Sequence, residues 1–134
     1  MHKLILKAAV YSIPVIDDDP RGFWIGCIGI RNDQRKVIAR NGSIQQLFSM
    51  SLDPTEMQKR SEYHAEGRIL NKMTKGGEMF VARISRQTGE LMMARPCGYC
   101  RAKIRSYRIN KVYYSVNNDQ YGVWLPQSNT DRIF

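Results

Sequence analysis

The sequence predicts a single α/β domain, residues 1–134, built on a mixed β-sheet. Helical and strand-like segments alternate along the chain, as is typical of this fold class. The run from Phe23 to Ile30 is continuously apolar, as in a strand that is buried on both faces. Near the end, only four residues separate the apolar segments Val112–Val116 and Tyr121–Leu125. Four residues are too few for a crossover helix, so these two strands must pair as an antiparallel C-terminal hairpin.

The first half of the chain predicts a helix followed by two strands. A helix is expected from His2 to Ser12, because apolar residues recur at helical spacing there and Pro14 ends the pattern. After the strand Phe23–Ile30, the polar residues 32–34 turn the chain, which returns as a second strand from Lys36 to Ala39.

The second half predicts two further helices around a third strand. The expected elements are a helix from His64 to about Thr74, a strand from Met79 to Ile84, a loop from Ser85 to Glu90, a returning segment from Leu91 to Ala94, and a helix from Cys97 to about Arg108. With the terminal hairpin, this gives a sheet of five strands.

Composition limits the class of protein. The chain has 134 residues, 43% of them hydrophobic, and no apolar run approaches the length of a membrane span. Lys3 and Lys7 interrupt the apolar N-terminal stretch, which argues against a signal peptide. Three cysteines do not make a disulfide framework, so a reducing, cytoplasmic setting is expected. The formal charge of +9 favours polyanions or phosphorylated substrates, although simple solubility explains such a charge equally well.

Four residues carry the chemistry. His64, Cys97 and Cys100 offer one imidazole and two thiols, and Glu66 adds a carboxylate, a set that suggests a zinc ion with a proton carrier beside it. A thiol pair two residues apart at a helix start places both sulfurs on one side of the first turn. The N-terminal end of a helix is partially positive, which favours the thiolates that zinc needs. A lone C-x-x-C would equally suit a redox pair or half of a structural zinc site.

The full pattern, H-A-E at 64–66 and P-C-G-Y-C at 96–100, resembles the signature of the cytidine deaminase superfamily. The order of helices and strands matches this superfamily over nearly the whole chain. The resemblance therefore implies a three-layer α/β/α cytidine-deaminase-like fold around a five-stranded mixed sheet. The lead-in Ala94–Cys97 and the ending Lys111–Ser115 look like small bacteriophage-encoded members, which would place the protein in the host cytoplasm. The antiparallel terminal hairpin is similar to the branch that acts on free nucleosides.

The resemblance also implies a role for each site residue. His64, Cys97 and Cys100 would bind Zn²⁺, and Glu66 would shuttle protons without touching the metal. The backbone amide of Ala65 would bind the base carbonyl, and Asn41 would contact the sugar. These roles imply a hydrolytic deaminase in which zinc-bound hydroxide attacks C4 of cytosine and uracil is the product.

Two departures from the superfamily concern the substrate. Many relatives carry Thr or Ser just ahead of Pro-Cys, where this chain has Ala94 and Arg95, and the stretch between the second strand and His64 is longer than in the nucleoside enzymes. Arg95 is therefore either a phosphate contact or solvated. Arg101, Arg105 and Arg108 form a basic stripe on the third helix, which is either a solvated face or a track for a phosphate backbone.

Three functions follow, in order of preference. The first is a deaminase of a cytosine nucleoside or nucleotide, such as cytidine, deoxycytidine or its phosphate, and the second is a deaminase of single-stranded DNA or RNA. The third is a non-catalytic, nucleic-acid-binding zinc module, which would need Cys27 or His2 as a fourth ligand. No membrane partner is expected, and a homo-oligomer is consistent with the superfamily, many of whose members are dimers or tetramers.

Overall fold

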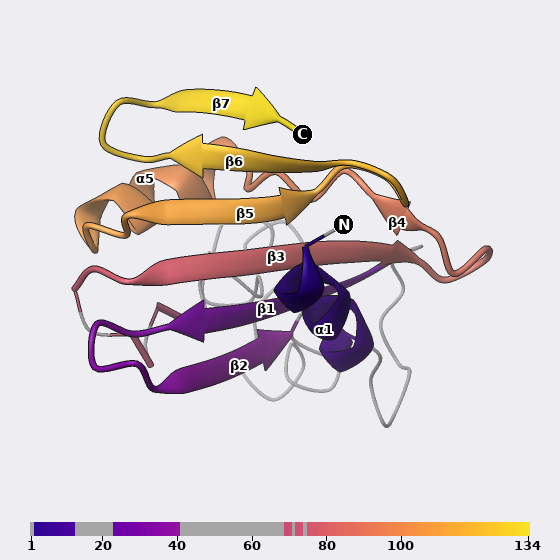
Figure 1. The fold of residues 1–134 in the computed structure, drawn as a ribbon, viewed down its shortest axis with the longest axis horizontal. Coiled ribbons are helices and arrows are strands. Elements are labelled where there is room, and N and C mark those ends of the chain that lie inside the picture. The colour runs from indigo at the N-terminus through magenta and orange to yellow at the C-terminus, as the bar shows by residue number, and fades with distance from the viewer. Residues whose placement is uncertain (1, 13–22, 41–68, 71, 74) are drawn as a thin grey trace, which may run out of the picture.

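The computed structural model describes residues 2–12, 23–40, 69–70, 72–73 and 75–134 of the chain. In these residues it contains two helices and a sheet of seven strands (Figure 1). The elements are α1 (Lys3–Ser12), β1 (Phe23–Ile30), β2 (Lys36–Arg40), β3 (Glu78–Ser85), β4 (Leu91–Met92), α5 (Gly98–Ser106), β5 (Lys111–Ser115), β6 (Tyr121–Leu125) and β7 (Thr130–Ile133).

The sheet is mixed and open, with the strand order β2-β1-β3-β5-β6-β7 and with β4 paired to β3. Strands β3 and β5 run parallel, and α5 lies between them in the sequence, as a crossover connection requires. The other pairs among the described strands are antiparallel. The predicted C-terminal hairpin is confirmed, because β5 and β6 pair antiparallel with Val112 opposite Trp124.

The structure adds two strands to the five that the sequence predicts. The returning segment after the 86–90 loop forms a two-residue strand, β4, in which Met92 pairs with Arg83 of β3. The polar tail forms β7, which pairs with β6 and makes the edge of the sheet (Figure 1).

Each face of the sheet carries its own apolar cluster, because successive side chains along a strand point to opposite faces. Helix α1 covers one face, where its buried residues pack against β1 and β3 (Figure 1). This cluster comprises Ile5, Ala8, Ala9, Ile28, Phe80 and Ala82. Helix α5 lies on the other face (Figure 1), where the larger cluster includes Cys100, Ile104, Ile69, Leu70, Cys27, Val81 and Trp124.

The larger cluster also holds the segment that precedes β3. A Cβ on Gly29 of β1 would collide with the side chains of Met73 and Ile69, so the absence of a side chain at Gly29 allows this segment to pack closely on the sheet. Ile69 and Leu70 are helical, and the Met73 amide donates to the Ile69 carbonyl at 3.0 Å. The helix predicted from His64 to about Thr74 otherwise lies largely outside the described residues.

The two helices that are described begin and end close to the predicted residues. Helix α1 begins at Lys3, since His2 stands before it and its Nδ1 accepts the Leu4 amide at 3.2 Å. Helix α5 ends at Ser106, two residues before the predicted end, and Arg108 has a left-handed φ of 55° that cannot continue the helix. Within the described part of the chain, no helix has the length and apolar character needed to cross a membrane.

Candidate functional site

The two cysteines of the P-C-G-Y-C motif lie at the start of α5. Cys97 is the residue before the first helical turn, and Cys100 is in that turn. Cys97 is exposed, whereas Cys100 is fully buried in the larger apolar cluster. Neither forms a disulfide, and the same holds for Cys27. The pair therefore presents one thiol to the surface and one to the core at the same helix end.

The electrostatics of this helix end favour thiolates. The Arg101 amide is bonded to the Cys97 carbonyl at 2.8 Å, so the helical hydrogen bonds begin there and the preceding amides point out of the helix end. The first turn of α5 contains no acidic residue, and no side chain caps it. The partial positive charge of the helix end is thus uncompensated within the turn, which lowers the cost of a negative charge on either sulfur.

The start of α5 lies at the carboxyl ends of the parallel strands β3 and β5. The Ala94 amide donates to the carbonyl of Ser115, the last residue of β5, at 2.8 Å. In open α/β sheets, ligands bind outside the carboxyl ends of the strands, where the helix N-termini also lie. The cysteine pair therefore occupies the edge at which this fold class places its sites.

Ser115 fixes that edge. Its fully buried hydroxyl donates to the Met92 carbonyl at 2.7 Å and accepts the Arg83 amide at 3.1 Å. The Ser115 side chain thus connects β3, β4 and β5. It does so at Met92, a few residues before the Pro96–Cys97 segment in the sequence. Sequence reasoning missed this role, because a serine at the end of an apolar strand carries no signal of its own.

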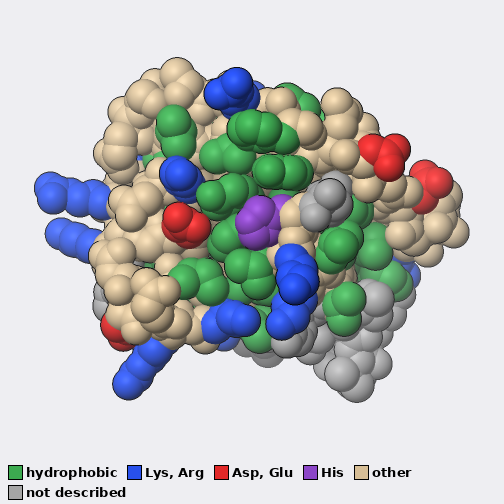
Figure 2. Space-filling model, viewed as in Figure 1, with side chains coloured by type: hydrophobic (Ala, Val, Ile, Leu, Met, Phe, Trp, Pro, Cys, Tyr) green, Lys and Arg blue, Asp and Glu red, His purple; other side chains and the backbone are tan. Residues whose placement is uncertain are grey.

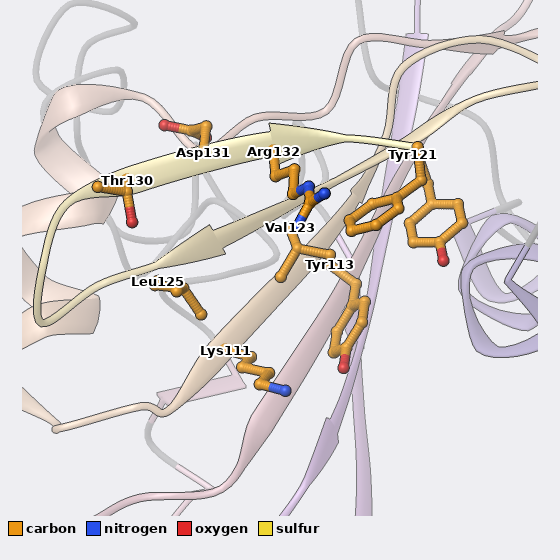
Figure 3. A pocket seen from close by; sticks show the side chains of 9 residues that line it. Lys111, Tyr113, Tyr121, Val123, Leu125, Thr130, Asp131 and Arg132 are labelled. Atoms are coloured by element: carbon orange, nitrogen blue, oxygen red, sulfur yellow. The ribbon is translucent and has the colours of Figure 1, made fainter.

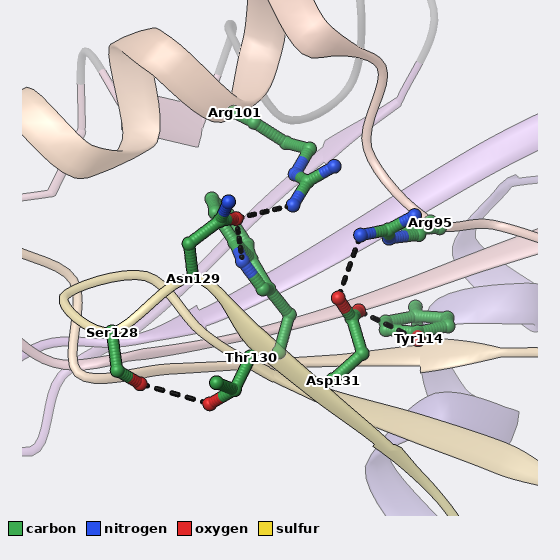
Figure 4. A network of polar contacts seen from close by, with 8 residues as sticks. Arg95, Arg101, Tyr114, Ser128, Asn129, Thr130 and Asp131 are labelled. Atoms are coloured by element: carbon green, nitrogen blue, oxygen red, sulfur yellow. Dashed lines mark hydrogen bonds and ion pairs between the residues drawn. The ribbon is translucent and has the colours of Figure 1, made fainter.

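Arg95, the residue before Pro96, binds the C-terminal hairpin (Figure 4). Its guanidinium forms an ion pair of 2.6 Å with the carboxylate of Asp131 in β7. The other oxygen of Asp131 accepts the Tyr114 hydroxyl at 2.9 Å. The interpretation of Arg95 as a phosphate contact or a solvated residue did not anticipate this partner within the chain.

The pKa of Tyr114 is raised from its ordinary value of 10.0 to about 12, mainly by burial, and the hydrogen bond to Asp131 and the negative charge of Asp131 act in the same direction. The charges of Arg95 and Arg101 act the opposite way and lower it. Tyr114 therefore stays a neutral hydrogen-bond donor over the whole physiological range.

Arg101, on the second turn of α5, also has partners in the hairpin (Figure 4). Its guanidinium donates to the side-chain oxygen of Asn129 and lies 4.8 Å from the centre of the Trp124 ring. The same oxygen of Asn129 accepts the Trp124 indole N–H at 3.0 Å. Asn129 takes a left-handed φ of 53°, which the tight turn before β7 requires and which asparagine tolerates better than most residues.

The remaining two arginines of the predicted basic stripe are exposed. Arg105 is on the last turn of α5, but Arg108 lies beyond the end of the helix. The predicted stripe is therefore not continuous: Arg101 packs on Trp124, and Arg108 leaves the helix with a left-handed backbone.

Four of the predicted site residues lie outside the described residues: His64, Glu66, Ala65 and Asn41. Among the residues that the structure describes, no group of three or more histidine, cysteine, aspartate or glutamate side chains is placed to hold a metal ion. The two described residues of the three predicted ligands, Cys97 and Cys100, are thiols at a positive helix end and fit zinc in their donor chemistry.

The two alternative fourth ligands have different positions. His2 lies on the α1 face of the sheet, where its ring centre is 4.9 Å from that of Phe80 and 5.0 Å from that of Tyr113. This is the opposite face from Cys100. Cys27 is buried in the same cluster as Cys100. Of the two, only Cys27 is on the side of the sheet where the cysteine pair lies.

Comparison of the chain with models of known protein families and with curated proteins found no match.

Proposed function

We propose that this protein is a zinc-dependent hydrolytic deaminase that converts cytosine to uracil in a nucleoside or nucleotide. The observation that carries the proposal is the position of Cys97 and Cys100, at the start of α5 and at the carboxyl ends of the parallel strands β3 and β5. The proposal includes the three-layer arrangement of the superfamily that the sequence resembles, and the presence of helices on both faces of the sheet supports it (Figure 1).

The segment that follows the H-A-E motif gives independent support. Ile69 is only three residues beyond Glu66 in the sequence, and it packs in the same cluster as Cys100. The Gly76 amide donates to the carbonyl of Tyr107, the residue after α5, at 3.0 Å. The segment before β3 and α5 thus finish at the same edge of the sheet. A helix that runs back from Ile69 alongside α5 would start at the edge where Cys97 lies.

The residues have distinct roles in the proposed reaction. Cys97, Cys100 and His64 would hold the zinc ion, which supplies a water of lowered pKa when it is bound. Glu66 would take a proton from that water and deliver it to the ring nitrogen and then to the departing ammonia. The Ala65 amide and the Asn41 side chain would orient the base and the sugar.

A small substrate is favoured over a polymer as the deaminase substrate. Arg95 and Arg101, two of the four arginines expected to contact phosphate, are engaged by Asp131 and Asn129. Arg105 and Arg108 are exposed and, with the formal charge of +9, favour the second candidate, a deaminase of single-stranded DNA or RNA. A cytoplasmic location and a homo-oligomer remain part of the proposal.

The test is to incubate the zinc-loaded full chain with cytidine, deoxycytidine, their monophosphates and a cytosine-containing single-stranded oligonucleotide. Ammonia release and the mass of the base are the readouts. We expect turnover of at least one monomer. Turnover of the oligonucleotide alone would favour the second candidate, and no turnover by protein with bound zinc would contradict the deaminase.

Glu66→Gln tests the chemistry separately from the fold. We expect the variant to retain zinc and its circular dichroism spectrum but to lose activity, because a carboxamide does not carry the proton. Glu90→Gln removes the same charge from an exposed loop residue and should retain full activity. Full activity in Glu66→Gln would remove Glu66 from the mechanism.

A further inference from the structure

The α1 face of strands β5, β6 and β7 carries an open groove with a volume of about 580 Å³ (Figure 3). It lies beyond α1, whose buried residues pack on β1 and β3. Figure 2 shows apolar side chains gathered over this side of the molecule, with lysine and arginine side chains among and around them. The groove is on the opposite face of the sheet from Cys100, so what it binds does not depend on the proposed deaminase.

A row of aromatic rings crosses this face. Phe80 stacks on Tyr113 with ring centres 4.6 Å apart, and Tyr113 lies 6.5 Å from Tyr121. Tyr121 stacks on Phe134 at 5.3 Å. The row therefore spans β3, β5, β6 and the residue after β7, and we call it the aromatic row. Its outer end is accessible, because 51% of Phe134 is exposed.

Cations accompany the rings on the same face. Lys111 lines the groove two residues before Tyr113, and Arg132 lines it two residues before Phe134, as the alternation of a strand dictates. The guanidinium of Arg132 lies 5.4 Å from the centre of the Phe134 ring. Figure 3 shows the Arg132 side chain directed toward the groove and Asp131 directed away from it. The Asp131 carboxylate is bonded to Arg95 and Tyr114 on the other side of the sheet.

One acidic residue borders the groove. Glu78 of β3 is the register partner of Lys111, and its charge contributes, after burial, to the raised pKa of Tyr113. Among the described groove residues, Asp131 is bonded on the other face of the sheet. The charges left to face the groove are those of Lys111 and Arg132, with Glu78 at its border.

We propose that this groove binds single-stranded RNA, with bases stacked on Tyr121 and Phe134 and with phosphates beside Lys111 and Arg132. Exposed rings on a sheet face are a general platform for unpaired bases, and cations beside them follow the backbone. The excess of basic residues in the chain, 21 against 12 acidic, matches a polyanion and opposes self-association through the same surface. The hydroxyls of Tyr113 and Tyr121 provide partners for the 2′-hydroxyl groups that distinguish RNA from DNA.

The aromatic row is tested by fluorescence anisotropy of a short, labelled single-stranded RNA with the full chain. We expect Phe134→Ala and Tyr121→Ala each to weaken binding about tenfold, as loss of a stacked base does. Ile133→Ala is the matched control, because Ile133 is similarly exposed but lies on the other face of β7. Equal loss in Ile133→Ala and Phe134→Ala, or no loss in Phe134→Ala, would overturn the proposal.

The cations are tested through the salt dependence of binding. The double variant Lys111→Gln/Arg132→Gln should lower the slope of log affinity against log salt by roughly 1.4, at about 0.7 for each lost phosphate contact. The double variant Lys36→Gln/Lys75→Gln removes the same charge from exposed residues outside the groove and should leave the slope unchanged. Equal changes in both would show general attraction to a basic protein and would overturn the site.

Two further readouts use the unaltered chain, so they do not depend on how a variant folds. Ultraviolet crosslinking to the RNA followed by tryptic digestion should modify the 112–132 peptide, and crosslinks confined to α5 would contradict the site. Sedimentation should show the same oligomeric state of the protein with and without the RNA. A dimer that RNA does not dissociate and that Phe134→Ala abolishes would assign the groove to a second copy. Tighter binding of the matching DNA would overturn the choice of RNA.

Discussion

The guanidinium of Arg95 and the carboxylate of Asp131 lie 2.6 Å apart and connect the residue before Pro96 to the edge strand β7. The same carboxylate accepts the Tyr114 hydroxyl from β5. The two cysteines lie at the start of α5. The segment that leads into this helix is bonded to β5 through Ala94 and to β7 through Arg95. This arrangement makes the geometry of the candidate metal site depend on residues far from it in the sequence.

Asp131→Asn should lower the free energy of unfolding by about 1 kcal/mol, because a partly exposed ion pair is worth little but its hydrogen bond to Tyr114 is also weakened. Urea denaturation measures the change. Asp119→Asn removes the same charge from an exposed turn and should have a smaller effect. An equal change in the two variants would show that the ion pair contributes nothing specific.

Tyr114 should ionise only well above the ordinary pKa of a tyrosine. Its folded pKa, about 12, is above its ordinary value of 10.0, so the folded state holds the proton more tightly than the unfolded state. The resulting stabilisation is fully present below pH 10 and is lost as the pH rises toward 12. Spectrophotometric titration should show this late step, Tyr114→Phe should remove it, and Asp131→Asn should move it to lower pH. A late step that persists in Tyr114→Phe would assign it elsewhere.

Ser115→Ala should lower the free energy of unfolding by about 1–3 kcal/mol, because it removes a fully buried hydroxyl and leaves the Arg83 amide and the Met92 carbonyl without their side-chain partner. Thermal unfolding measures the loss. Ser106→Ala is the matched control: the Ser106 hydroxyl also donates to a backbone carbonyl, that of Lys103, but at an exposed position. A loss of the same size in Ser106→Ala would argue against a special role for Ser115.

Gly122 has no room for a side chain, because a Cβ there would overlap the ring of Tyr114. Gly122→Ala should therefore cost about 1–3 kcal/mol of stability through overpacking. Gly98→Ala is the contrast, since a Cβ at Gly98 meets no atom and alanine favours the helix that begins there. A stable Gly122→Ala variant with an unchanged Tyr114 titration would contradict the packing described.

Zinc binding should distinguish the three cysteines. Cys97→Ser and Cys100→Ser should lose bound zinc, measured by atomic absorption, whereas Cys27→Ser should retain it. Chelation of the metal from the unaltered chain should lower the melting temperature, because a ligand that binds only the folded state stabilises it. Zinc loss in Cys27→Ser as well would move the site toward the closed, structural type of the binding-module alternative.

The sequence predicted the elements whose apolar pattern matches their burial. Strand β1 is a continuous apolar run buried on both faces, and the four-residue link after β5 left only an antiparallel pairing for β6. Strand β7 was missed because all four of its residues are exposed, so it has no apolar alternation to detect. Its existence depends on backbone pairing with β6, which is a property of the assembled sheet.

The candidate site could be predicted only as far as its motifs extend. Cys97 and Cys100 lie at a helix start, as the spacing indicated. The partners of Arg95 and Arg101 were not predictable, because Asp131 and Asn129 are 36 and 28 residues away and their tail has no recognisable pattern. Long-range polar pairs of this kind are decided by tertiary packing, so a helical projection could not show that Arg101 contacts Asn129 and Trp124.

The ion pair between Arg95 and Asp131 can form only late in the synthesis of the chain. Both cysteines leave the ribosome before the strand that holds their lead-in, because Asp131 follows Arg95 by 36 residues. At the usual rate of chain elongation, about 5–20 residues per second, that interval lasts seconds. A nascent chain therefore exposes its thiols to metal and to oxidants before β7 exists. The final geometry at the start of α5 is reached only once the hairpin has docked.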